Sequence, residues 1–140
     1  MACLIDTCVI YEIRHPRGAR QVKAAVAALD PASVFLSVVT LGEIAAGIDR
    51  LDPGSRREAL EVWLVGLQTT FENRILDVTR PVARRWGEFT AEARRNGRTL
   101  AAPDGLIAAT ASVHGLAVMT RNRADFQVTG VPIVDPWEDV

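Results

Sequence analysis

Short apolar runs alternate along the chain with longer segments in which apolar residues recur every three or four positions. The short runs are typical of buried strands, and the longer segments are typical of amphipathic helices. The predicted strands cover residues 2–5, 34–36, 75–78, 117–119 and 131–134. The predicted helices cover residues 19–29, 40–51, a segment from Ser55 through Leu67, a segment between Thr79 and Asn96, and residues 104–114. This alternation predicts an α/β fold: a three-layer α/β/α sandwich around a mostly parallel sheet of about five strands.

Individual residues predict where some of these elements begin and end. Ser55 and Glu58 have the spacing of a capping box at the start of a helix. Thr79 stands where an N-cap would begin the next helix, and Gly115 is placed to end the helix that follows. Pro132 cannot donate a backbone hydrogen bond, so it places the last strand at an edge of the sheet.

Length and composition indicate the number of domains and the cellular compartment of the protein. The chain has 140 residues, of which 49% are hydrophobic and 24% charged, so it can bury one core and form a single domain over residues 1–140. Its apolar runs are far shorter than the roughly 18 residues of a membrane span, and no signal sequence precedes them. We therefore expect a cytoplasmic protein with no membrane contact, in which Cys3 and Cys8 are reduced thiols.

The formal net charge is −1, so the chain lacks the basic excess of proteins that bind nucleic acid mainly by neutralising phosphates. Any contact with nucleic acid must therefore be local. Arginines do cluster within residues 56–57, 84–85, 94–98 and 121–123, although such clusters are also typical of solvated helix faces.

Several carboxylates can meet at one edge of the predicted sheet. In open parallel sheets, functional groups collect beyond the carboxyl ends of the strands, and Asp6 and residues 120–122 each follow a strand. Glu43 lies shortly after the second strand, and Asp104 opens the helix that leads into the fourth, so both can reach the same edge. Asp6, Glu43 and Asp104 are therefore the candidate centre of a site.

Most of these acids also have a purely structural explanation. Thr40 and Glu43 have capping-box spacing, and Asp104 can cap its own helix. Asp125 fits a turn as well as a site. Asp6 differs from the others, because no helix-cap pattern in the sequence explains an acid directly after a buried strand.

If the acids do meet, their charges require compensation. Two carboxylates about 5 Å apart repel by roughly 3 kcal/mol at an effective dielectric constant of about 20. Proton uptake, an arginine partner or a divalent cation can offset this repulsion, and ligation by oxygen alone indicates Mg²⁺ or Mn²⁺. His15 and His114 lack the spacing of zinc ligands. A carboxylate-held Mg²⁺ suits phosphoryl chemistry, with a phosphodiester as the natural substrate class.

The acids stand within motifs whose order and spacing cover nearly the full chain. These motifs are LIDT at 4–7, LSVVTLGEIAAGI at 36–48, APDGLIAATA at 102–111, TRN at 120–122, DF at 125–126 and PW at 136–137. The set resembles the PIN-domain family, and within it the VapC-like, FitB-type toxin ribonucleases of bacterial toxin-antitoxin pairs. The resemblance implies a PIN-like fold with an acidic site at Asp6, Glu43 and Asp104, of which Asp6 and Asp104 are direct metal ligands.

The resemblance leaves the fourth corner of this site open. Many relatives have an aspartate where this chain has Asn122, so either Asn122 fills that place as a neutral group or the nearby Asp125 supplies the charge. Thr7 and Thr120 match family positions that hydrogen-bond within the site, although either can also be a simple strand-end hydroxyl.

The resemblance further implies an Mg²⁺-dependent endoribonuclease that is the toxin of a type II pair, forms a homodimer and is inhibited by a cognate antitoxin. The alternative is a PIN-fold binding module that complexes a DNA-binding partner and acts in transcriptional regulation with little nuclease activity. A response-regulator receiver also has a parallel sheet and an acidic Mg²⁺ pocket. That class needs a lysine near the end of its last strand, and the only lysine, Lys23, lies far from there.

Overall fold

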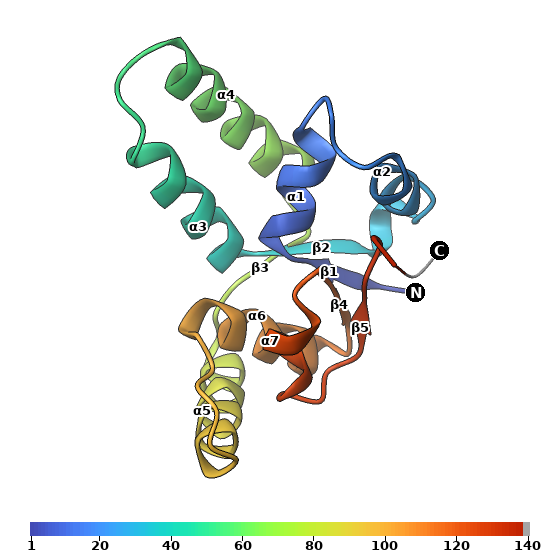
Figure 1. Ribbon diagram of the computed structural model, residues 1–140, viewed down its shortest axis with the longest axis vertical. Coiled ribbons are helices and arrows are strands. Elements are labelled where there is room, and N and C mark those ends of the chain that lie inside the picture. Colours follow the sequence, from blue (N-terminus) through green and yellow to red (C-terminus); the bar gives the residue numbers. More distant parts are fainter. Residues whose placement is uncertain (139–140) are drawn as a thin grey trace.

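A five-stranded parallel sheet forms the middle layer of this computed structural model, which describes residues 1–138 (Figure 1). The strands are β1 (Cys3–Ile5), β2 (Val34–Ser37), β3 (Ile75–Leu76), β4 (Ala117–Met119) and β5 (Ile133–Val134). They lie in the order β3-β2-β1-β4-β5, and all neighbouring strands are parallel. The predicted parallel sheet is confirmed, and β5 lies at an edge, as Pro132 indicated.

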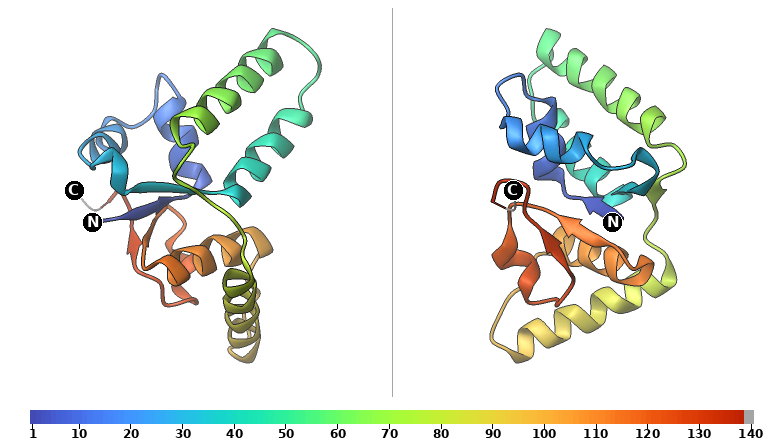
Figure 2. Two further views of the ribbon diagram at one scale, coloured as in Figure 1. Left: turned by 180° about the vertical axis from the view of Figure 1, so that it is seen from behind. Right: turned by 90° about the vertical axis from the view of Figure 1, so that its right-hand side faces the viewer.

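Helices cover both faces of the sheet. One face carries α1 (Thr7–Arg14), α2 (Arg20–Ala27), α3 (Val38–Asp49) and α4 (Ser55–Thr70), and a short 3₁₀ turn (Pro31–Ser33) leads into β2. The other face carries α5 (Arg80–Arg95), α6 (Ala102–His114) and α7 (Arg123–Gln127), as the views in Figures 1 and 2 show. The predicted α/β/α sandwich is therefore confirmed. In the described part of the chain, no helix combines the length and apolar character needed to cross a membrane.

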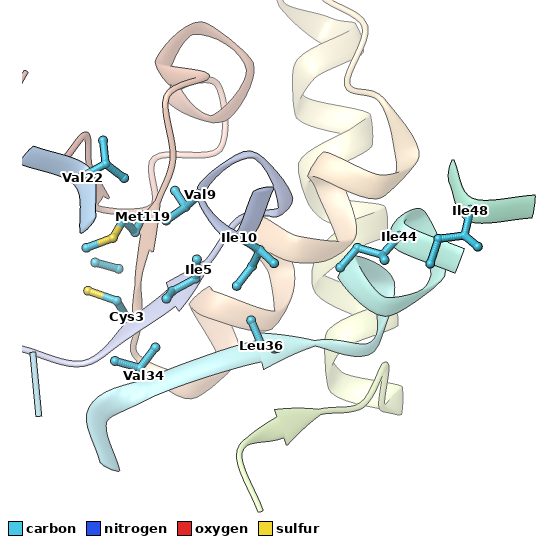
Figure 3. Close-up of a cluster of buried hydrophobic side chains, with 11 residues drawn as sticks. Cys3, Ile5, Val9, Ile10, Val22, Val34, Leu36, Ile44, Ile48 and Met119 are labelled. Atoms are coloured by element: carbon cyan, nitrogen blue, oxygen red, sulfur yellow. The ribbon is translucent and has the colours of Figure 1, made fainter. Parts of the chain in front are cut away.

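Each face of the sheet buries its own hydrophobic cluster. Successive side chains of a strand point to opposite faces, so Cys3 and Ile5 of β1 enter the cluster beneath α1 to α3 (Figure 3). Leu4 enters the cluster on the opposite face, with Ile107 of α6 and Phe126 of α7. Because both faces of β1 are covered, its sequence is a continuous apolar run.

Some helices begin elsewhere than predicted. The eight residues of α1 start directly after β1 without a connecting loop, and this helix was not among the predicted ones. Gly54, not Ser55, is the N-cap of α4, and no side-chain hydrogen bond caps that helix, so the predicted capping box of Ser55 and Glu58 is wrong. Ser55 is already inside the first turn. Thr79 caps α5 as predicted, because its side chain accepts a hydrogen bond from the backbone amide of Val82.

Candidate acidic site

The acidic site lies at the topological switch point of the sheet. From β1 the chain builds outwards to β2 and β3 on one side, whereas β4 and β5 extend the other side. Ligands of open parallel sheets usually bind outside the carboxyl ends of the strands at such a switch point. Asp6 is the first residue after β1, and Thr120 is the first residue after the adjacent strand β4.

Asp6 is buried and held by hydrogen bonds to both carboxylate oxygens. Oδ1 accepts a hydrogen bond of 2.8 Å from the backbone amide of Thr7, which makes Asp6 the N-cap of α1. Oδ2 accepts a hydrogen bond of 2.8 Å from Oγ1 of Thr120 and a longer one of 3.6 Å from Sγ of Cys8. The prediction that no helix cap explains Asp6 is therefore wrong, because α1 begins immediately after it. Capping and site chemistry share one side chain.

Glu43 lies in the second turn of α3 and is tied to α1. Its Oε1 accepts a hydrogen bond of 2.7 Å from Oγ1 of Thr7, whose hydroxyl also lies 3.3 Å from that of Thr40. The N-cap of α3 is Ser37, whose Oγ accepts a hydrogen bond of 3.0 Å from the backbone amide of Val39. The capping-box explanation of Glu43 is therefore wrong, since the helix starts before Thr40.

Asp104 is half-buried in the first turn of α6, and the N-cap of that helix is Ala101. The explanation of Asp104 as an N-cap is therefore wrong. Burial, together with the negative charges of Asp6, Asp125 and Glu43, raises the pKa of Asp104 from 3.8 to about 6. The other three carboxylates predicted from the sequence thus lie close enough for their charges to act on Asp104.

The fourth corner contains Asn122 and Asp125 in different roles. Asn122 precedes α7, and its backbone amide donates a hydrogen bond of 3.0 Å to Oγ1 of Thr120. Its side chain makes no cap hydrogen bond. Asp125 lies in the first turn of α7, so it is not a turn residue, and its charge acts on Asp104. Which of the two completes the site remains a prediction.

Sequence reasoning missed Cys8, which lies between the two strand ends. Its Sγ lies 3.6 Å from Oδ2 of Asp6 and 3.6 Å from Oγ1 of Thr120. Burial raises the pKa of this thiol, which favours the neutral form beside a carboxylate. The helical spacing of Val9, Ile10 and Ile13 was the available signal, since it would have predicted α1 and with it the position of Cys8.

The carboxylates have the right chemistry for a divalent cation, but they do not yet lie close enough together to bind one. Within residues 1–138, no three His, Cys, Asp or Glu side chains stand close enough to hold a metal ion as they are placed. The pKa of Asp104 nevertheless responds to three other acids, because charges act over longer distances than coordination bonds. An all-oxygen, like-charged donor set fits Mg²⁺ or Mn²⁺. The carboxylates would have to come closer together to share one ion.

A cavity of about 540 Å³ opens beside Glu43, lined also by Val39, Arg50 and Pro103. A larger cavity of about 700 Å³ lies at the opposite edge of the sheet, where the strands begin. Its lining includes Ala2, just before β1, and Ala117, the first residue of β4. Its described lining contains no acidic residue. We therefore place the site by the carboxylates and not by the size of the cavity.

The chain is similar to known proteins along almost its whole length. The family model described as "PIN domain" matches residues 3–131. The chain is 35% identical to toxin FitB of Neisseria gonorrhoeae over 97% of this chain and 99% of that protein. It is 32% identical to VapC ribonuclease Y4jK of Sinorhizobium fredii, over 96% of this chain and 97% of that protein.

Two solved structures share the fold along almost the whole length. The crystal structure of FitAcB from Neisseria gonorrhoeae superimposes with a TM-score of 0.91 at 34% identity and covers 97% of this chain and 99% of that one. The structure of FitAB bound to an IR36 DNA fragment superimposes with a TM-score of 0.90 at 33% identity, over 97% and 96% of the two chains.

Proposed function

The chain belongs to the PIN-domain family, as its motifs predicted, and from that premise we propose that it is a metal-dependent endoribonuclease, the toxin of a type II toxin-antitoxin pair. One observation carries the proposal: four acids from distant parts of the chain converge beyond β1 and β4, where burial and the charges of the other three raise the pKa of Asp104 to about 6. A protein keeps such repulsion where the charges serve a site. The relative named VapC ribonuclease Y4jK makes RNA hydrolysis the natural chemistry for it, and the relative named toxin FitB supports the toxin role.

The side chains divide the work between holding an ion and holding one another. Asp6 and Asp104 would bind Mg²⁺, or Mn²⁺ in its place, with Glu43 and Asp125 completing the negative site. When bound, the ion polarises the scissile phosphate and lowers the pKa of an attacking water. Thr7 donates a hydrogen bond from its hydroxyl to Glu43 and another from its backbone amide to Asp6, so it orients both acids.

The proposal includes two protein partners. FitAcB and FitAB are complexes of a relative, so we propose a cognate antitoxin for this chain. The homodimer of the toxin itself is proposed from the family resemblance alone. An arginine from the antitoxin would neutralise the same carboxylates that bind the metal. Antitoxin and metal would then compete for the site, and the isolated toxin would be the active form.

A second candidate function is regulatory. FitAB, at 33% identity, was solved bound to DNA, which favours a role in which the chain complexes a DNA-binding partner and has little nuclease activity of its own. The two functions differ in what the partner-free chain does. Only the nuclease cleaves RNA alone.

The test is to incubate purified, partner-free protein with total RNA in Mg²⁺ or in EDTA and to map the cut ends. Cleavage is expected in Mg²⁺ alone and is expected to be lost in Asp6→Asn and in Asp104→Asn. Asparagine also serves as an N-cap, so Asp6→Asn keeps α1 capped while removing the charge. Glu92→Gln, an exposed charge change on α5, is the matched control and should cleave like the wild type.

The outcomes separate the two candidates. Equal cleavage by the wild type and Asp6→Asn would reveal a contaminating nuclease and contradict the proposed nuclease function. If folded wild-type protein cleaves no RNA in Mg²⁺ or Mn²⁺, the regulatory function takes its place. The proposed antitoxin is tested separately, by asking whether a small arginine-bearing protein copurifies with the chain from the native host.

A further inference from the structure

Arg121, whose backbone adjoins the acidic site, makes a cation–π contact with Trp137. The guanidinium carbon of Arg121 lies over the ring of Trp137, 5.3 Å from its centroid. Arg121 directly follows Thr120, and its backbone amide hydrogen-bonds the thiol of Cys8. Since Thr120 and Cys8 both contact Asp6, the backbone of Arg121 is fixed next to the first acid of the site.

The tryptophan is held in place from several sides. Its ring is half-buried against the core cluster beneath α1 to α3. Its backbone amide donates a hydrogen bond of 2.9 Å to Oδ1 of Asp135, and its backbone carbonyl accepts one from the side chain of Gln21. Asp135 is only 3% exposed, and its other carboxylate oxygen lies 3.4 Å from Nε of Arg123. A ring supported in this way gives the guanidinium group of Arg121 a fixed partner.

The acidic site creates a need for such a cation. Four carboxylates repel the phosphates of any approaching strand, and the net charge of −1 offers no general attraction. The arginines of α5 are less suited, since Arg84 and Arg85 pair with Glu88 of the same helix at 3.6 and 3.4 Å. Arg121 is exposed and adjoins the site.

We propose that the Arg121–Trp137 pair is a stacking platform for a nucleobase of single-stranded RNA, which places the strand over the acidic site. The Trp137 ring lies on one side of the guanidinium group, and the exposure of Arg121 leaves room for a base on the solvent side. Proteins recognise unpaired RNA bases by stacking them on aromatic rings and on arginine planes. This inference rests on the proposed ribonuclease function and adds the surface that receives the substrate.

Binding is best measured without cleavage, in full-length protein carrying Asp104→Asn. The probe is a short, fluorescently labelled single-stranded RNA of mixed sequence, and anisotropy gives the Kd. Arg121→Lys keeps the charge and loses the plane, so it should weaken binding about tenfold, the lower range for one stacked base. Arg94→Ala on α5 removes an exposed arginine away from the site and should leave the Kd unchanged. Circular dichroism checks that each variant is folded.

A series of RNAs, each with one abasic nucleotide, separates stacking from a phosphate contact. At one position, loss of the base should raise the Kd of the protein that retains Arg121 by the same factor as Arg121→Lys does with the intact RNA. The same abasic RNA should not raise the Kd of Arg121→Lys any further. Equal binding by Arg121→Lys and its parent, or losses that multiply at every position, would overturn the platform. If the wild type still cleaves RNA, the proposed function survives that result. Absence of both RNA binding and cleavage would overturn the function and the platform together.

Discussion

Thr7 donates a hydrogen bond of 2.7 Å from its hydroxyl to Oε1 of Glu43, and this bond joins the start of α1 to the second turn of α3. Thr120 has the corresponding role on the other side of β1, where its hydroxyl donates to Oδ2 of Asp6. Two threonines that follow two parallel strands therefore orient two acids.

Removal of the Thr7 hydroxyl should lower the activity more than the stability. Thr7→Val has nearly the same volume but cannot orient Glu43, so we expect RNA cleavage to slow by about ten- to hundredfold. The free energy of unfolding should fall by only about 1 kcal/mol, because Thr7 is partly solvated. Thr7→Ser keeps the hydroxyl and is the matched control. Full activity of Thr7→Val would show that Glu43 needs no orientation from α1.

Asp104→Asn should stabilise the folded protein at about pH 7. The raised pKa means that the charged form of Asp104 is less favourable in the folded state than in the unfolded state. Because the residue is half exposed, solvent screening reduces the gain from neutralising it to about 1 kcal/mol. Urea unfolding of the two proteins measures the difference.

The same substitution has a defined pH dependence. The folded protein binds a proton at Asp104 more tightly than the unfolded chain, so the wild type loses stability as the pH rises from 3.8 to about 6. The advantage of Asp104→Asn should therefore be complete above about pH 6 and disappear towards pH 3.8, where the aspartic acid is neutral in both states. A gain that persists at the acidic end would mean that charge is not its cause.

The periodicity of apolar residues was sufficient to predict the architecture, because strands and amphipathic helices bury local patterns. The prediction left out α1, because its apolar positions follow those of β1 without any loop, although Val9, Ile10 and Ile13 have helical spacing. The start of α3 was misplaced for a related reason: Ser37 is both the last residue of β2 and the N-cap of α3. When a strand runs directly into a helix, a later pair such as Thr40 and Glu43 can imitate a cap.

The acids could be placed at one sheet edge from sequence, because parallel strands align their carboxyl ends. Their separations could not be predicted, since these depend on side-chain rotamers that no spacing encodes. The pairing of Arg121 with Trp137 is of the same kind. Sixteen positions separate the two residues in sequence, and only the adjacency of β4 and β5 brings them together.

Mg²⁺ should raise the melting temperature through the acidic site. A ligand that binds only the folded protein stabilises it by mass action. The carboxylates gather only in the folded state, so Mg²⁺ should bind that state and relieve their repulsion. We expect a rise of about 3 °C or more for the wild type in excess Mg²⁺, reversed by EDTA, and a clearly smaller rise for Asp104→Asn. NaCl at equal ionic strength is the control for screening. An equal rise in both proteins would place the ion elsewhere.

Gly105, next to Asp104, should not tolerate a side chain. A Cβ at this position would lie 2.7 Å from Cδ1 of Trp86 and 3.1 Å from Cδ2 of Leu100, so α5 and α6 would have to separate. We expect Gly105→Ala to lower the free energy of unfolding by roughly 1–2 kcal/mol, after the better helix propensity of alanine offsets part of the overpacking. RNA cleavage should fall with it, because Asp104 moves with the first turn of α6.

Gly87→Ala is the matched control for Gly105→Ala, since Gly87 is exposed in α5 and a Cβ there would meet no described part of the chain beyond its own helix within 4 Å. It should raise the stability by up to about 1 kcal/mol. A smaller side chain at Trp86 should rescue Gly105→Ala in a double-mutant cycle, and the loss of the indole costs no hydrogen bond, because its Nε1 has no partner among the described residues. Stability of Gly105→Ala equal to that of Gly87→Ala would show that Trp86 yields freely and does not fix the position of Asp104.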